Sequence, residues 1–152
     1  MKAYPELQQA WAETKAGTST EPIPEQLVVD LERRYNIGLP DDFRQYLRLS
    51  SPVGDAMDNE TIAWWNFGQI KNIPEEYPHE LGAVITNAGK EYLIFADYCI
   101  WCWAWAISCA NDETRGKVAL IAGPTYDRFL ADSFSDFVQK YLSDPKGLSP
   151  IS

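Results

Sequence analysis

The segment that decides the fold reads Asn36-Ile37-Gly38-Leu39-Pro40-Asp41-Asp42-Phe43-Arg44-Gln45-Tyr46-Leu47-Arg48-Leu49-Ser50. Asn36 and Gly38 end one predicted helix, because both residue types tolerate the left-handed backbone that closes helices. Pro40 begins the next helix, where its missing amide hydrogen is no loss, and the two aspartates that follow place negative charge against the positive end of the helix dipole. The segment therefore predicts two consecutive helices joined by a short turn.

Both predicted helices carry apolar side chains on one face. The first helix begins near Pro24-Glu25, and its apolar positions recur every three or four residues, at Leu27, Val28, Leu31 and Tyr35. The second helix has a predicted buried stripe made of Phe43, Tyr46 and Leu47. We expect the two helices to pack through these faces.

From these residues onward the chain resembles the SMI1/KNR4 family, also called the SUKH superfamily. The most specific match is Leu39-Pro40-Asp41-Asp42-Phe43, followed by a helix that closes in Leu47-x-Leu49-Ser50. Further pieces occur in the family's order: Trp64-Trp65 leading to Phe67 and Ile70, the strand-like segment 92–107, Gly116-Lys117-Val118, and Ser133-Phe134-Ser135-Asp136-Phe137. The resemblance covers about residues 24–142, and it implies that Leu39, Pro40, Phe43 and Trp65 are residues of the fold.

Length and composition favour one folded domain over residues 1–152. The chain has 45% hydrophobic and 13% aromatic residues, enough for a conventional core at a length of 152 residues. We expect the core of the domain over about 24–142, a leading helix and linker over 1–23, and a tail over 144–152. The formal charge of −9, from 13 basic and 22 acidic residues, disfavours nucleic acid and anionic membranes as partners and favours basic ones.

The chain reads as a cytoplasmic protein. Its N-terminus lacks a basic region followed by an apolar run, so a secretory signal is not expected. Its most apolar segment, 99–110, is shorter than the ~20 residues that a membrane-spanning helix needs. The three cysteines all fall in that segment, and an odd, crowded set suits a reducing compartment better than a disulfide framework.

The order of the predicted elements gives an α+β fold. A leading helix from Pro5 to Lys15 and the two helices above come first, and a closing helix containing Phe134 and Phe137, capped by Asp132 or Ser133, comes last. Between them we predict strands over 61–67, 91–98, 99–109 and 116–121, with a hairpin loop over 111–115. The N-terminal helices and the C-terminal helix would pack on a mostly antiparallel sheet.

The tryptophans leave two interpretations open. Alternation along a strand places Trp101, Trp103 and Trp105 on one face, where they either plug the core or form a platform for a partner. Trp64 and Trp65 are adjacent and would face opposite ways, which leaves at least one of them as a candidate for an accessible position.

Residues that could carry catalysis or bind metal give no convincing site. On a strand, Cys99 and Cys102 would point to opposite faces, so they could neither chelate together nor form a disulfide. His79 is the only histidine and no nucleophile elbow accompanies it. Acidic residues of the loops could gather a divalent cation or form an acid/base pair, although such residues usually face solvent. We therefore expect no catalytic residue, no metal and no cofactor.

The resemblance implies a binding module, because many bacterial members of the superfamily resemble immunity proteins that neutralise toxin domains. We expect a monomer whose partner is a basic nuclease or deaminase toxin, steered by acidic loops and anchored by exposed aromatic residues. The candidate partner-binding residues are Asp55, Asp58, Glu60, Trp64, Glu75, Glu76, Trp103 and Tyr126. Two alternatives stay open: a regulatory domain in cell-wall or signalling control, which fungal relatives indicate, and a carboxylate enzyme using Asp55, Asp58 or Glu60.

Overall fold

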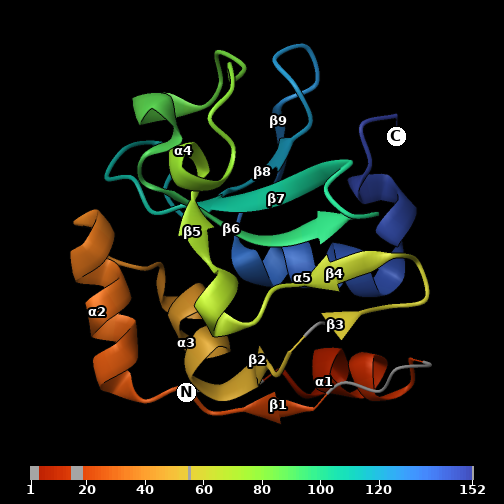
Figure 1. Cartoon of the computed structure of the whole chain (residues 1–152). Coiled ribbons are helices and arrows are strands. Elements are labelled where there is room, and N and C mark those ends of the chain that lie inside the picture. Colours follow the sequence, from red (N-terminus) through yellow and green to blue (C-terminus); the bar gives the residue numbers. More distant parts are fainter. Residues whose placement is uncertain (1–3, 15–18, 55, 152) are drawn as a thin grey trace.

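An antiparallel sheet forms the centre of the molecule in the computed structural model, which describes residues 4–14, 19–54 and 56–151 (Figure 1). Its strands run in the order β3-β4-β6-β7-β8-β9, and β5 also pairs with β6. Their bounds are β3 Ala56–Met57, β4 Ile62–Trp64, β5 Lys71–Asn72, β6 Tyr92–Tyr98, β7 Trp103–Ser108, β8 Val118–Ile121 and β9 Arg128–Ala131. A separate ribbon pairs β1 Thr20–Glu21 with β2 Ser51–Pro52. The α+β prediction is confirmed.

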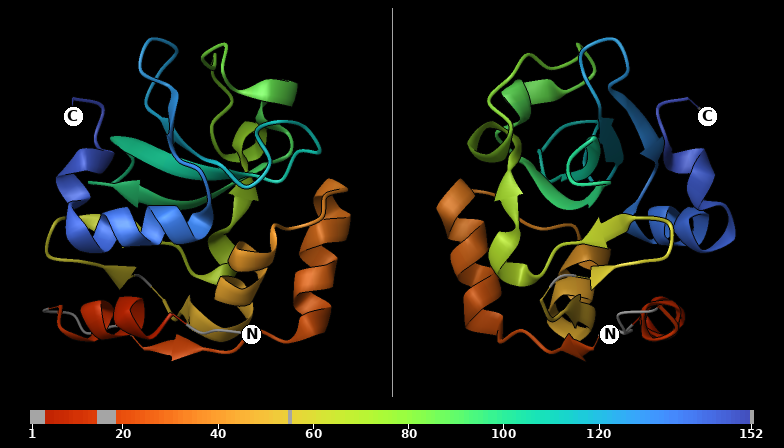
Figure 2. Two further views of the ribbon diagram at one scale, coloured as in Figure 1. Left: turned by 180° about the vertical axis from the view of Figure 1, so that it is seen from behind. Right: turned by 45° about the vertical axis from the view of Figure 1, so that its right-hand side comes forward.

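The four longer helices gather on one side of this sheet, as both views of Figure 2 show. They are α1 Pro5–Ala12, α2 Glu25–Tyr35, α3 Asp41–Ser50 and α5 Phe134–Ser143. The short helix α4 Ile73–Glu76 lies on the opposite side of the sheet (Figure 1). The chain also forms 3-10 turns at Phe67–Gln69, Thr86–Gly89 and Pro145–Leu148. The closing helix α5 begins as predicted, because the Ser133 hydroxyl accepts a hydrogen bond of 2.9 Å from the amide of Asp136.

Aromatic rings fill the space between α3, α5 and the sheet. Phe134 of α5 lies 5.1 Å from Phe43, 4.6 Å from Tyr46 and 5.3 Å from Phe95, measured between ring centroids. All four side chains are fully buried, and Leu47 is buried beside them. The apolar stripe that the sequence predicted on the second helix is therefore the face that meets the core.

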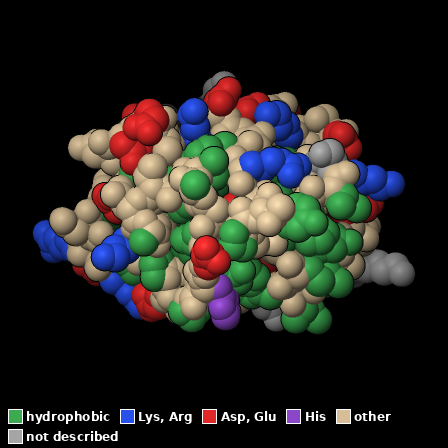
Figure 3. Space-filling model, turned by 90° about the horizontal axis from the view of Figure 1, so that it is seen from above, with side chains coloured by type: hydrophobic (Ala, Val, Ile, Leu, Met, Phe, Trp, Pro, Cys, Tyr) green, Lys and Arg blue, Asp and Glu red, His purple; other side chains and the backbone are tan. Residues whose placement is uncertain are grey.

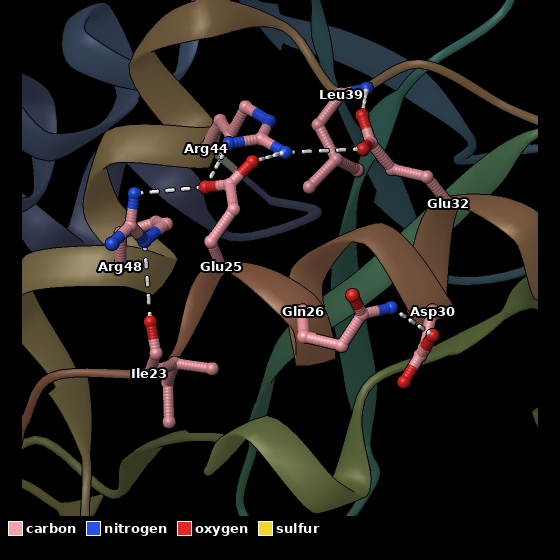
Figure 4. Close-up of polar contacts among 8 residues, drawn as sticks. All are labelled: Ile23, Glu25, Gln26, Asp30, Glu32, Leu39, Arg44 and Arg48. Atoms are coloured by element: carbon pink, nitrogen blue, oxygen red, sulfur yellow. Dashed lines mark hydrogen bonds and ion pairs between the residues drawn. The ribbon is translucent and has the colours of Figure 1, made fainter.

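Charged residues on the outer side of the same segment hold α2 against α3 (Figure 4). Arg44 donates to both carboxylate oxygens of Glu25, at 2.8 and 2.6 Å, and to Glu32 at 3.2 Å. Arg48 donates to Glu25 at 2.8 Å, and Glu32 accepts from the amide of Leu39 at 2.9 Å. In the segment 36–50, the apolar residues of α3 therefore pack into the core, and the arginines of α3 form ion pairs that stabilise its contact with α2.

The ends of several elements differ from the predictions. Asn36 closes α2 with φ of 53°, as expected, whereas Gly38 is not left-handed. Leu27 is 46% exposed instead of packing on α3. The leading helix ends at Ala12, and Lys15 lies outside the described residues. Within the predicted leading segment 1–23, Thr20 belongs to β1, which pairs with β2 because α3 brings Ser51 and Pro52 alongside it.

Two segments carry more structure than the sequence indicated. Strand β9 was not predicted, although it pairs with β8 along Arg128–Ala131. The predicted tail contains a 3-10 turn, Pro145–Leu148, whose Leu148 side chain is buried against the core. The reason is local: Leu148 follows α5 closely enough to fold back over Trp105, whose indole N–H donates to the Leu148 carbonyl at 3.0 Å.

The hydroxyl of Tyr141 on α5 donates to the carboxylate of Asp58, and this contact gives a prediction about alkaline pH. Burial raises the pKa of Tyr141 above its ordinary value, and the acceptor Asp58 raises it further. A folded-state pKa above the unfolded value means that this stabilisation is complete below about pH 10 and is lost as the pH rises beyond it. In urea unfolding between pH 8 and pH 11, we expect Tyr141→Phe to flatten the alkaline loss of unfolding free energy. An unchanged slope would contradict the assignment.

Candidate partner-binding surface

The turn between β6 and β7 has an unusual backbone. Cys99, Ile100 and Trp101 have φ angles of 49°, 56° and 67°, so three consecutive residues other than glycine are left-handed. Each such residue costs about 1–2 kcal/mol, and a β-branched isoleucine is poorly suited to this conformation. The turn nevertheless leaves the Ile100 side chain 86% exposed to solvent.

Asp97, at the end of β6, holds this turn in place. Its buried carboxylate accepts a hydrogen bond of 2.8 Å from the amide of Trp101 and one of 3.3 Å from the indole N–H of Trp65. The Cys102 amide donates to the Tyr98 carbonyl at 2.8 Å, which closes the turn. Burial raises the pKa of Asp97, while these hydrogen bonds favour its charged form.

Aromatic stacking braces the turn on both sides. Tyr98 and Trp103 stack with their centroids 4.2 Å apart and their planes 6° apart. Trp101 stacks on Tyr77 at 5.1 Å, and its indole N–H donates to Glu76 at 3.3 Å. His79 meets the edge of the Tyr77 ring at 4.6 Å. Figure 3 views this end of the molecule and shows hydrophobic side chains gathered beside the single histidine.

This geometry corrects the predicted row of three tryptophans. Strand β7 begins at Trp103, so Trp101 belongs to the turn, and the alternation holds only from Trp103 onward. Trp105 is fully buried beneath the C-terminal segment, whereas Trp103 is half-buried. Cys99 and Cys102 are both exposed on the turn, with the Cys102 thiol 3.2 Å from the Cys99 carbonyl oxygen, so the premise that they share a straight strand was wrong.

A groove of about 520 Å³ opens beside the turn, between the β6–β7 hairpin and the C-terminal segment. Figure 1 shows these two parts of the chain side by side. The residues that line it are Glu60, Ile62, Tyr98, Trp103, Trp105, Asp144, Pro145, Lys146, Gly147, Ser149 and Ile151. The groove therefore adjoins the Tyr98–Trp103 stack, and together with the turn it forms what we call the hairpin surface.

The predicted binding residues lie in different parts of the structure. Glu60 and Trp103 line the groove, and Glu76 holds Trp101 of the turn. Tyr126 is 51% exposed but lies in the loop before β9, outside the groove lining. Asp55 lies outside the described residues.

Three other predicted residues have structural contacts. Trp64 has no exposed surface, because the helices cover its face of β4. Trp65 is also buried, and its indole N–H donates a hydrogen bond to Asp97. Glu75 pairs with Arg34 and accepts from Tyr35 at 2.6 Å. Asp58 accepts from the amides of Glu60 and Ile62 at 2.8 and 2.9 Å, which fixes the turn before β4. Trp64 is therefore removed from the candidate surface.

Sequence reasoning missed the exposed side chain of Ile100. Its only signal was its place between Cys99 and Trp101 in a run of β-favouring residues, which reads as continuous strand. The groove residue Asp144 was assigned to the tail, and Tyr98 to a strand end. No turn signal such as Asn-Gly occurs between Tyr98 and Trp103, so no local pattern breaks the predicted strand there.

The chain matches a known protein family over most of its length. The model of the family described as SMI1 / KNR4 family (SUKH-1) matches residues 22–140, which is most of the chain. The chain belongs to this family. No curated protein matches it significantly. The SUKH-1 match covers the α2–α3 pair, the sheet and most of α5, whereas the C-terminal wall of the groove lies beyond residue 140.

Within its described residues this SUKH-1 chain has neither a membrane-spanning helix nor a cluster of metal ligands. No helix there is long and apolar enough to span a membrane. No group of three or more His, Cys, Asp or Glu side chains in that part of the chain is placed to hold a metal ion.

Removing the anchor of the turn should destabilise the protein. We expect Asp97→Ala to lower the unfolding free energy by about 2–3 kcal/mol, since the donors of Trp65 and Trp101 lose their acceptor. Asp97→Asn is the matched control and should lose less unfolding free energy, because its amide oxygen still accepts one of the two hydrogen bonds. Urea unfolding measures both, and faster hydrogen exchange at the Trp101 amide would locate the loss. Equal stability of the alanine variant and the parent would contradict this role of Asp97.

Proposed function

We propose that this chain is an immunity protein, a non-catalytic module that neutralises a cognate toxin by binding it in the cytoplasm of the producing cell. The observation that carries the proposal is the exposed Ile100, held out by a strained turn beside an aromatic groove. Strained backbone persists only where surrounding contacts impose it, and it concentrates at functional sites. Membership of the SUKH-1 family supports a protein-binding role.

The chemistry of the surface supports a basic protein partner. The formal charge of −9 speeds the encounter with a positively charged domain. Once contact is made, apolar and aromatic residues near the centre of an interface contribute most of the affinity. Ile100 and Trp103 fit that role, and Glu60 supplies charge beside them. We propose that residues 1–152 act as one domain and as a monomer that occludes its target in a one-to-one complex.

The carboxylate enzyme receives no support from the geometry. Of its three candidate residues, Asp58 is engaged by Tyr141 and by two backbone amides, which is the role of a structural turn residue. Asp58 and Glu60 belong to no cluster of three potential metal ligands within the described residues.

Affinity capture with the tagged protein from lysate of its own organism tests the proposal, with the captured chain then produced and assayed alone. We expect a nuclease or deaminase toxin domain whose activity falls to background at one equivalent of this protein. Recovery of only a host signalling or wall-synthesis protein would favour the regulatory alternative. A captured toxin that stays active in excess of this protein would overturn neutralisation by direct binding.

A further inference from the structure

We propose that the groove of the hairpin surface binds an arginine side chain of a protein partner; this inference rests on the proposed function. The floor of the groove is aromatic: Tyr98 and Trp103 are half-buried and stack on each other, whereas the other apolar lining residues Ile62 and Trp105 are buried and add little exposed surface. A guanidinium group is planar and weakly hydrated, and it stacks on Trp and Tyr faces more readily than an ammonium group does. The floor therefore suits arginine better than lysine.

Two carboxylates face the groove without a basic partner of their own. Glu60 and Asp144 both line it and both are exposed, and neither forms an ion pair with a basic side chain within the described parts of the chain. By contrast, Glu25, Glu32, Glu75, Glu76 and Asp136 are all paired with arginine or lysine. Lys146 is the one basic residue among those that line the groove, so carboxylates outnumber cations there.

The wall that carries Asp144 is fixed before any partner arrives. The Trp105 indole donates to the Leu148 carbonyl at 3.0 Å, and Arg128 donates to the carbonyls of Ser149 and Pro150 at 3.0 and 3.2 Å. These bonds hold the C-terminal segment against the sheet and leave the groove open at about 520 Å³. A preformed groove costs less ordering entropy on binding than one that must form with its ligand.

Arginine amide is a probe that tests the groove without the toxin. The protein, with its indole nitrogens labelled with ¹⁵N, is titrated at low salt with arginine amide, citrulline amide and norleucine amide while the Trp103 indole resonance is followed. We expect a saturable shift with arginine amide and a millimolar dissociation constant, because one residue buries little surface. Citrulline amide has nearly the same shape without the charge, and it should bind at least about fivefold more weakly.

Variants decide whether the carboxylates act locally. The double variant E60Q/D144N should weaken arginine amide binding by at least about fivefold, and K146Q should strengthen it by about twofold. E80Q/E113Q removes the same two negative charges at exposed positions outside the groove lining and should change binding by less than about twofold. A dispersed amide spectrum in each variant shows that the fold is retained.

Three results would overturn the arginine groove. They are the absence of a saturable Trp103 shift, equal affinity for citrulline amide or norleucine amide, and equal weakening by the two double variants. The second result would show that the positive charge of the side chain contributes nothing to binding, and the third would show that only the overall charge of the protein matters. Because no toxin enters the titration, its failure would leave the immunity proposal to the capture experiment, and failure of the capture would leave the titration result standing.

Discussion

Trp64→Ala is expected to lower the unfolding free energy by about 3–5 kcal/mol, the range for removing a large aromatic side chain from a core. The Trp64 ring has no exposed surface, and it lies 5.4 Å from the ring of Trp11, 5.7 Å from Phe95 and 5.0 Å from Tyr141. Alanine would leave a cavity where α1, α5 and β4 meet. Since domains are stable by only about 5–15 kcal/mol, such a loss would leave the variant close to unfolding.

Denaturant unfolding followed by circular dichroism measures this loss, and Tyr126→Ala is its control. Tyr126 is half exposed in a loop, so its replacement should change stability by less than about 0.5 kcal/mol. If Trp64→Ala kept the parent's stability and weakened partner binding instead, the sequence-based assignment of Trp64 to the interface would be right and the buried position would be wrong.

Substitutions at Ile100 should move stability and binding in opposite directions. Glycine adopts positive φ without steric cost, so Ile100→Gly is expected to raise the unfolding free energy by about 0.5–1 kcal/mol after the larger entropy of the unfolded glycine is subtracted. The same change removes an apolar side chain that is 86% exposed and available to a partner. Ile100→Asp should weaken binding of the captured partner by at least about 30-fold, the loss typical of an interface hot spot.

Val84→Gly is the matched control for Ile100→Gly. Val84 is also a β-branched residue, 43% exposed, but its φ angle is not positive. Glycine there relieves no strain, so stability should not rise and binding should not change. Thermal unfolding and calorimetry with the captured partner measure the two effects. A fall in stability for Ile100→Gly would show that the turn is not strained, and unchanged affinity of Ile100→Asp would exclude this turn from the interface.

The burial of Trp64 and the exposure of Ile100 show where local sequence patterns fail to predict the structure. Both residues lie in runs rich in β-favouring residues, and alternation predicts one face in and one face out for each run. Trp64 is buried because the helices lie over its face of β4, and the adjacent Trp65 is buried as well, with its indole N–H donating to Asp97. Ile100 is exposed because Asp97 accepts the Trp101 amide and holds the chain in a turn. Alternation along a strand predicts neither the helices that cover β4 nor the hydrogen bond that bends the chain after β6.

What the sequence determined by itself was the framework of the fold. The α2–α3 pair, the closing helix with its Ser133 cap, the three main antiparallel strands and the 111–115 hairpin loop follow from local signals: caps, periodic apolar positions and turn residues act over a few neighbouring positions. The family match over residues 22–140 agrees with that framework.

Only the tertiary structure decided the candidate surface. The position of Trp105 under the C-terminal segment and the groove between Tyr98 and Asp144 depend on contacts between residues far apart in the chain. The left-handed turn combines nearby hydrogen bonds with the distant contacts of Trp101 to Tyr77 and Glu76. No local pattern encodes such contacts, because the backbone strain of one segment is offset by hydrogen bonds and stacking from others. A chain of this kind therefore shows its fold in its local sequence and its candidate site only in the assembled structure.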